Sequence, residues 1–181
     1  KVGDLIYLSK PLGTGYLLAA YFNNSEILSS DDFEKIINNL KIRNTFAVNS
    51  AINSGSKTMT DISGYGLSSH LIDICLSSEL SCELTINKSI LINSNLDLLR
   101  LFQSTGFENN YKSSKKFIEI SDNHPIENIL YDPQTNGPML IAIKKRNKEK
   151  FESFFSNKSD IRPILIGKFI DKLEKFIYVN E

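Results

Sequence analysis

The sequence predicts an α/β or α+β domain in which a mixed β-sheet is covered by helices. Two observations predict this class. Some segments repeat apolar residues at helical spacing, others alternate apolar and polar residues or are short apolar runs, and the two kinds are interspersed along the chain. The chain has 181 residues, which suits one domain with a substantial core. We therefore expect residues 1–181 to form a single domain.

Short segments have the patterns of strands. Residues 82–87 alternate apolar and polar side chains, as a half-buried strand does, whereas residues 139–143 are apolar throughout, as a buried strand is. The predicted strands are residues 4–9, 82–87, 116–120, 139–143, 163–170 and 175–179. A turn at residues 171–174 separates the last two, and hairpin-like pairs at several points favour a mixed sheet.

Helical patterns occupy most of the remaining chain. Asp31 and Glu34 have the spacing of a capping box, which predicts the start of the second helix. The predicted helices are residues 16–22, 33–40, 46–52, 67–79, 96–102 and 146–155. The pattern breaks at residues 54–66. The polar residues 108–116 are predicted to form a loop and to be the most flexible segment.

Composition argues against several classes of function. Lys and Arg total 21, as do Asp and Glu, so the formal net charge is zero. A nucleic-acid partner or an anionic membrane surface usually needs a basic excess, so we expect neither. No uncharged apolar run approaches the roughly 20 residues of a membrane span, and the first residues do not resemble a signal peptide. Because the chain begins without Met and close to a strand, we expect it to be a piece of a longer protein.

The cysteines and histidines predict no metal site. Cys75 and Cys82 are too few for a disulfide framework, which favours a reducing cytoplasm, and we expect both thiols to be buried and unreactive. His70 and His124 have no Cys or His at metal-ligand spacing, so a zinc site is not expected. No arrangement for nucleophilic catalysis can be argued from the sequence.

Three polar loops that contain glycine adjoin apolar elements, and they are the candidate sites: residues 10–15 (KPLGTG), 59–66 (MTDISGYG) and 131–138 (YDPQTNGP). We refer to them as loop 10–15, loop 61–66 (for the part of the second that begins at Asp61) and loop 131–138. In loop 61–66, Asp61 precedes Gly64, Gly66 and a helix start. A carboxylate there can hold Mg²⁺, and glycines with free N–H groups suit a phosphate. The alternative is that Asp61 or Ser63 only caps the helix.

The other two loops also allow a structural interpretation. In loop 10–15, Lys10 can meet a phosphate and Thr14 can donate a hydrogen bond to it, or the segment is a turn with Lys10 in solvent. In loop 131–138, Asp132 precedes a proline and is held extended. We expect its carboxylate to cap backbone N–H groups in the turn and to shape the loop rather than to perform chemistry.

In this order the three loops resemble selenophosphate synthetase (selenide, water dikinase). The segment GDLIYLSKPLGTG is similar to the entry into that family's C-terminal domain, and MTDISGYGLSSHL to its Thr-Asp-Val-Thr-Gly-Phe-Gly segment. The segment YDPQTNGPMLIAI resembles its Asp-Pro-Gln-Thr-Ser-Gly-Gly strand entry, and Gly167 fits a late Ile-Gly. The resemblance spans nearly the whole chain, and Asp-Pro-Gln-Thr is its most specific part.

The resemblance implies a fold like the C-terminal domain of aminoimidazole ribonucleotide synthetase and a reaction of selenide, ATP and water that gives selenophosphate, AMP and phosphate. It implies that an N-terminal domain, absent here, carries the ATP site and the reactive Cys or selenocysteine. That domain is the expected partner, and the full-length protein is expected to be able to form a homodimer. Asp61 matches a family aspartate that joins the Mg²⁺ site at the nucleotide phosphates, while Lys10, Thr14, Gly64 and Gly66 are expected near the phosphates. This chain alone is expected to be inactive.

Departures from the family pattern leave a second interpretation open. Pro138 stands where the family usually has a second glycine, and proline removes an N–H donor. Residues 108–116 match the family poorly beyond their asparagines. Both departures are compatible with a diverged structural or interaction domain that kept the fold and lost the activity. Another ATP-dependent relative, such as a thiamine monophosphate kinase, would have other residues at Asp-Pro-Gln-Thr.

Overall fold

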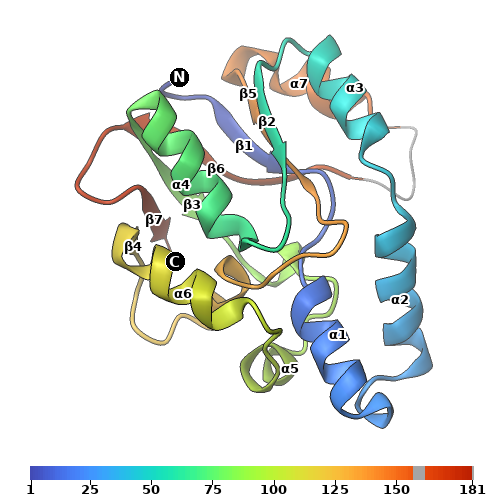
Figure 1. Ribbon diagram of the computed structural model, residues 1–181. Helices are drawn as coiled ribbons and strands as arrows, with labels where there is room; N and C mark the ends of the chain where they lie inside the picture. The colour runs from blue at the N-terminus through green and yellow to red at the C-terminus, as the bar shows by residue number, and fades with distance from the viewer. Residues whose placement is uncertain (157–161, 181) are drawn as a thin grey trace.

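A mixed β-sheet forms the centre of the molecule, which we describe from a computed structural model for residues 1–156 and 162–180. The sheet has seven strands in the order β2-β5-β1-β6-β3-β7-β4, and helices lie against it (Figure 1). The strands are β1 (Leu5–Leu8), β2 (Thr58–Asp61), β3 (Leu80–Thr85), β4 (Ile118–Glu119), β5 (Met139–Ile143), β6 (Ile164–Asp171) and β7 (Ile177–Asn180). The predicted fold class is confirmed.

The strands pair across long sequence distances. β1 lies antiparallel to both β5 and β6, β2 antiparallel to β5, and β3 antiparallel to β6 but parallel to β7. The expectation of hairpin-like pairs was wrong, because no pairing in the described residues joins strands that are consecutive along the chain. The two final strands were predicted correctly, but β3 lies between them and contacts both.

Helices cover both faces of the sheet, because successive strand residues point to opposite sides. The helices are α1 (Thr14–Asn23), α2 (Ser30–Lys41), α3 (Thr45–Asn53), α4 (Gly66–Ser78), α5 (Leu96–Leu101), α6 (Phe107–Ser114) and α7 (Lys148–Ser153), with 3₁₀ turns η1 (Ser25–Ile27), η2 (Lys88–Ile90), η3 (Lys115–Phe117), η4 (Glu127–Leu130) and η5 (Lys145–Asn147). On one face, Ile6 and Leu8 of β1 join the large core under α1 and α4. On the other, Tyr7 of β1 joins a smaller core with α3 and α7.

Two segments differ from their prediction. Residues 108–116 were expected to be a flexible loop, but most of them form α6, whose buried face carries Phe107, Asn110 and Ser114. Two of these three side chains are polar, so hydropathy does not reveal that face. Residues 54–66 were expected to break the pattern without a strand, yet they contain the edge strand β2.

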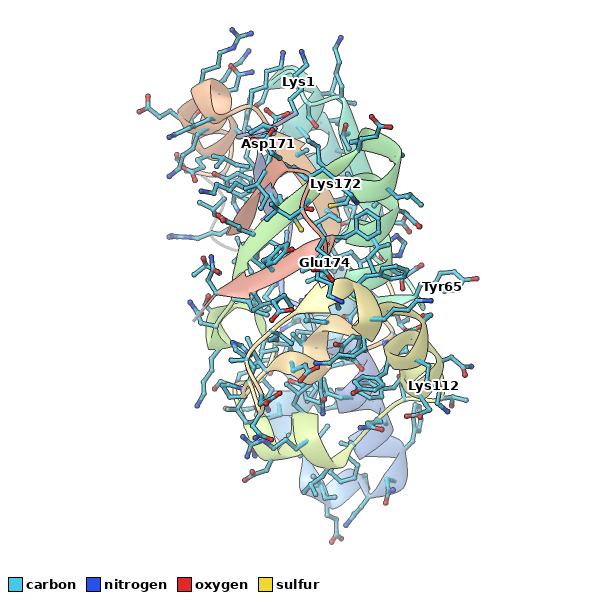
Figure 2. The ribbon with its side chains drawn as sticks, turned by 90° about the vertical axis from the view of Figure 1, so that its left-hand side faces the viewer. Lys1, Tyr65, Lys112, Asp171, Lys172 and Glu174 are labelled. Atoms are coloured by element: carbon cyan, nitrogen blue, oxygen red, sulfur yellow. The ribbon has the colours of Figure 1, made fainter. Side chains whose placement is uncertain are left out.

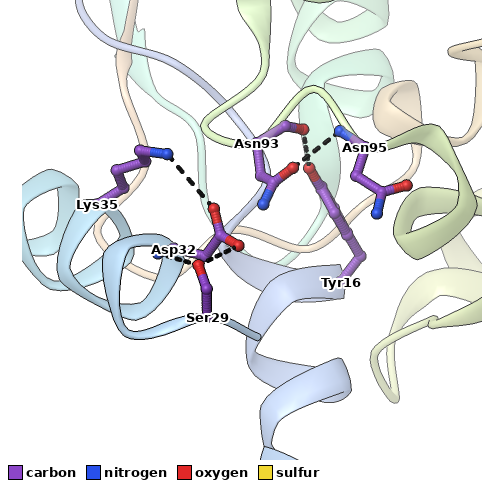
Figure 3. A network of polar contacts seen from close by, with 6 residues as sticks. All are labelled: Tyr16, Ser29, Asp32, Lys35, Asn93 and Asn95. Carbon is purple, nitrogen blue, oxygen red and sulfur yellow. Dashed lines mark hydrogen bonds and ion pairs between the residues drawn. The ribbon is translucent and has the colours of Figure 1, made fainter. Parts of the chain in front are cut away.

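The cap of α2 lies two residues before its predicted position. The N-cap is Ser29, whose hydroxyl oxygen accepts from the backbone N–H of Asp32 at 3.1 Å. The same hydroxyl donates to Asp32 Oδ2 at 2.7 Å, and Lys35 approaches the other carboxylate oxygen (Figure 3). These contacts, the Ser29 hydroxyl first, lower the pKa of Asp32. The predicted Asp31–Glu34 capping box was therefore wrong, because Ser29 is the residue that caps the helix. Ser29 and Asp32 are three residues apart, as Asp31 and Glu34 are, so the spacing alone could not distinguish the two pairs.

The two cysteines are free and buried, as expected. They come from α4 and β3, where the Cys75 thiol lies 3.7 Å from the carbonyl oxygen of Phe176. In the part of the chain that the structure describes, no helix has the length and apolar character needed to cross a membrane.

Gly167 gives a direct test of the sheet arrangement. A Cβ at this position would lie 2.0 Å from the carbonyl oxygen of Glu83 on the neighbouring strand β3. We expect Gly167→Ala to lower the free energy of unfolding by about 1–3 kcal/mol, because overpacking forces the strands apart. Gly64→Ala is the control: a Cβ there meets nothing within 4 Å, so a change within about 0.5 kcal/mol is expected. Equal effects of both substitutions in urea unfolding would contradict the described pairing of β3 and β6.

Candidate functional site

The three polar loops meet at one end of β1, β2 and β5. The backbone N–H of Ile62 donates to the carbonyl of Pro138 at 2.9 Å, and that of Gln134 donates to the carbonyl of Ser63 at 3.0 Å. Loop 10–15 reaches the same place, because the backbone N–H of Gly13 donates to Gln134 Oε1 at 3.0 Å. In Figure 1 the starts of α1 and α4 and the segment before β5 lie side by side.

Gln134 joins loop 131–138 to the start of α1. Its carboxamide oxygen also accepts from the backbone N–H of Thr14 at 3.3 Å and from the Thr14 hydroxyl at 3.2 Å. The Thr14 hydroxyl in turn accepts from the backbone N–H of Thr135 at 2.9 Å. Thr14 is fully buried. Its hydroxyl is thus occupied by loop contacts, and the prediction that it meets a phosphate stays a prediction.

Asp132 shapes the site from inside. Its Oδ2 accepts from the backbone N–H of Gly15 at 3.2 Å and from Gln134 Nε2 at 2.8 Å. The carboxylate does accept from a backbone N–H group, but the expectation that this group lies in the turn of Asp132 itself was wrong, because Gly15 belongs to loop 10–15. A Cβ at Gly15 would lie 2.2 Å from the carbonyl oxygen of Pro133, so only glycine allows this approach. Burial raises the pKa of Asp132 to about 7 despite these hydrogen bonds.

Lys10 points into the protein instead of towards solvent. It is 1% exposed, and its ammonium donates to the carbonyls of Asn39 at 2.9 Å and Ile42 at 3.1 Å. These carbonyls lie at the C-terminal end of α2, where a cation is favoured by the helix dipole. Burial lowers the pKa of Lys10 to about 8. Both hydrogen bonds serve to dock α2, so the expected solvated lysine was wrong, and the phosphate role stays a prediction.

Asp61 is the last residue of β2 and is exposed to solvent. It does not cap α4: the N-cap is Tyr65, and no side chain there accepts a capping hydrogen bond. Gly64 is also exposed, and the space around its Cα is open. Gly66 is buried, with φ of +73°, and a Cβ there would lie 3.0 Å from the carbonyl oxygen of Tyr131. Gly66 is therefore required by the backbone, whereas Asp61 and Gly64 are accessible to a ligand.

Two further side chains hold loop 61–66. Asn110 of α6 donates to the carbonyls of Gly64 at 2.9 Å and Tyr131 at 3.0 Å, so it joins loop 61–66 to loop 131–138. His70 of α4 accepts from the backbone N–H of Ser63 at 3.3 Å. Neither residue was predicted as part of the site. For Asn110 the family's asparagines were the available signal; for His70 it was the spacing from the glycine loop.

Pro138 retains half of its strand pairing. Its carbonyl accepts from Ile62, but a proline has no N–H, so the bond in the opposite direction cannot form. The adjoining Gly137 approaches closely: a Cβ there would lie 2.2 Å from the carbonyl oxygen of Ile62. The substitution at position 138 thus removes a donor next to the loop without separating β2 from β5.

The outer surface of the site carries an aromatic residue. Tyr65 is 68% exposed, and Figure 2 shows it projecting from the same edge of the molecule as Lys112 of α6. Lys112 pairs with Glu108 of the same helix at 3.0 Å, in an exposed contact of little stabilising value. The accessible chemistry of this surface is therefore one free carboxylate, glycine backbone and an exposed phenol.

The described residues could supply only part of the coordination of a metal ion. Among the described residues, no group of three or more His, Cys, Asp or Glu side chains is placed to hold a metal. Mg²⁺ takes oxygen ligands and commonly combines one or two protein carboxylates with water and phosphate oxygens. Asp61 can supply one such oxygen, because it is exposed at the end of an edge strand. The remaining ligands would be water, phosphate oxygens or groups outside the described residues.

Comparisons with known sequences give the context of these features. A family model described as AIR synthase related protein, C-terminal domain, matches residues 1–180. The chain is 30% identical over 168 residues to the selenide, water dikinase of Shewanella sp. (strain MR-7) and 32% identical over 169 residues to that of Shewanella baltica (strain OS185). Each alignment covers 92% of this chain and 47% of the relative. The chain therefore spans about half the length of the curated relatives it matches.

Solved structures share the fold. The hydrogenase maturation protein HypE of E. coli superimposes on 100% of the chain, using 47% of its own length, with a TM-score of 0.66 and 13% identity. Thiamine-monophosphate kinase from Stenotrophomonas maltophilia K279a covers 99% of the chain with 51% of its own length, at a TM-score of 0.63 and 14% identity. A HypE structure in complex with ATP covers 94% of the chain with 43% of its own length, at a TM-score of 0.58 and 15% identity.

The buried carboxyl of Asp132 predicts a pH-dependent stability. An acid whose pKa rises to about 7 on folding stabilises the fold where it is protonated, and this contribution is lost as the pH rises through 7. Asp132→Asn removes the titrating group. Between about pH 6 and about pH 8, the native chain should lose on the order of 1 kcal/mol relative to the variant in urea unfolding. A constant difference across this range would show that Asp132 is already ionised at its lower end.

Proposed function

The chain belongs to the AIR synthase related family as its C-terminal domain, and from this premise we propose that it is the C-terminal domain of a selenophosphate synthetase. The proposed enzyme converts selenide, ATP and water into selenophosphate, AMP and phosphate. Similarity to selenide, water dikinases along 92% of the chain supports this function. So does the segment Asp132–Thr135, whose buried contacts organise the site.

A single observation carries the proposal: Asp61 is exposed at the end of β2, in a loop whose other polar groups are largely bonded. The carbonyls of Ser63 and Gly64 and the N–H of Ser63 all have partners within the domain. A carboxylate that is presented in this way and is not used by the fold is available to a ligand. We assign to Asp61 one ligand position of the Mg²⁺ that accompanies the nucleotide phosphates.

The bound Mg²⁺ would neutralise phosphate charge during phosphoryl transfer. Asp61 would help to hold this Mg²⁺ in position against the phosphates from the side of this domain, and such positioning lowers the barrier. The start of α4 contributes as well, since backbone N–H groups at a helix N-terminus favour anions. Gly64 lies beside this start and leaves room for a phosphate oxygen. Lys10 and Thr14 are buried and hold the loops in place, and their role near the phosphates stays a prediction.

The rest of the site belongs, in this proposal, to an N-terminal ATP-binding domain of the same protein. The chain matches about half the length of its curated relatives, which leaves room for such a domain. That domain is the proposed partner of loop 61–66, and a homodimer of the full-length protein in the cytoplasm is part of the same proposal. The chain alone is expected to turn over no ATP.

A diverged, non-catalytic domain remains the second candidate, favoured by Pro138. The other argument for it fails, because residues 108–116 largely form a regular helix whose Asn110 joins two loops of the site. Loop 61–66 presents the accessible carboxylate of Asp61, which favours the enzyme.

Asp61→Ala in the full-length protein tests the proposal. We expect kcat/KM for selenide-dependent release of AMP from ATP to fall by roughly 100-fold or more, because the Mg²⁺ that neutralises the reacting phosphates loses a preorganised ligand. Stability should be nearly unchanged, since Asp61 is exposed. Asp31→Ala is the matched control: it makes the same substitution at an exposed position of α2. Normal turnover by a folded Asp61→Ala enzyme would rule out the proposed role of Asp61.

A further inference from the structure

We propose that His70 is the positioning residue of the site: its Nε2 atom holds the backbone of loop 61–66 so that Asp61 is presented to its ligand. The inference rests on the proposed function for its effect on activity. It rests on the structure alone for the contact between His70 and the loop.

The contact fixes the state of the imidazole ring. The backbone N–H of Ser63 donates to His70 Nε2 at 3.3 Å, and a backbone N–H can only donate. Nε2 must therefore be unprotonated, and the neutral ring carries its proton on Nδ1. The Ser63 hydroxyl lies 3.3 Å from the same nitrogen. Because Nε2 has one lone pair, the backbone donor and the hydroxyl compete for it.

The charges around the ring are compatible with this state. His70 is half-buried, and burial lowers its pKa, while Asp61 and Asp73 act in the opposite direction. The net direction is downward, so the neutral acceptor is favoured.

His70 completes the set of contacts that immobilise the loop. The carbonyl of Ser63 accepts from Gln134, and the carbonyl of Gly64 accepts from Asn110. The N–H of Ser63 is the corresponding donor, and His70 is its acceptor. The N–H of Ser63 belongs to the peptide unit between Ile62 and Ser63, so the contact with His70 limits movement of the backbone just beyond Asp61. Removing the acceptor frees that peptide unit while the sheet and α4 stay intact.

Side chains of graded reach test this role in the full-length protein. His70→Gln places an acceptor oxygen near the position of Nε2, His70→Asn places one only as far as Nδ1, and His70→Leu has none. We expect the Leu and Asn variants to lose roughly tenfold or more in kcat with KM for ATP within about threefold, because Asp61 acts in the transition state. The Gln variant should stay within about threefold of the native kcat.

Two controls separate this contact from a general effect. His124→Gln changes the other histidine, in the loop after β4, and should leave kcat unchanged. In the Asp61→Ala background, His70→Leu should cause no further loss, because the two residues act through one interaction. Additive losses, or a His70→Leu enzyme with native kcat, would overturn the inference.

Nitrogen NMR of histidine-labelled full-length protein tests the contact independently of activity. The His70 signal, assigned by its absence in His70→Gln, should show an unprotonated Nε2 and a protonated Nδ1 near neutral pH. A protonated Nε2 would overturn the inference even if Asp61→Ala is inactive. If Asp61→Ala is fully active, the proposed function fails, and the ring spectrum alone then decides whether His70 holds the loop.

Discussion

The closing of loop 131–138 on the start of α1 is the constraint on which the rest of the site depends. One carboxamide oxygen, of Gln134, accepts from two backbone N–H groups and a hydroxyl, and the neighbouring Asp132 accepts from Gly15. All these groups are buried, so a lost partner would leave polar atoms unsatisfied at a cost of about 1–3 kcal/mol each. Loop 131–138 also bonds to loop 61–66: its Pro138 carbonyl accepts from the N–H of Ile62, and its Gln134 N–H donates to the carbonyl of Ser63. These two bonds place loop 61–66.

The site thus divides its polar residues between two tasks. Lys10, Thr14, Asp132 and Gln134 are buried and bond to backbone groups of neighbouring elements. Asp61 and Gly64 lie outside this network and face solvent. These bonds favour one arrangement of the loops, although Asp132 Oδ1 is buried without a hydrogen-bond partner among the described residues. Such rigidity is what a ligand-binding carboxylate on an edge strand needs.

The sequence allowed the fold class, most of the strands and the three loops to be predicted, because apolar periodicity and glycine positions carry that information. It could not place β2, since Thr58–Asp61 contains one apolar residue and pairs on one side only. It could not reveal α6, whose buried Asn110 and Ser114 read as solvent-facing residues. The burial of Lys10 was missed for a related reason: its partners are backbone carbonyls of α2, which no side-chain pattern records.

The central claim is that Asp61 joins a metal ion at the nucleotide phosphates once the rest of the protein is present. A crystal structure of the full-length protein with Mg²⁺ and a non-hydrolysable ATP analogue tests this claim most directly. We expect a carboxylate oxygen of Asp61 at about 2.0–2.1 Å from the metal, the usual Mg²⁺–oxygen distance. A nucleotide-bound structure in which every metal ligand comes from elsewhere, with Asp61 still in solvent, would contradict the account.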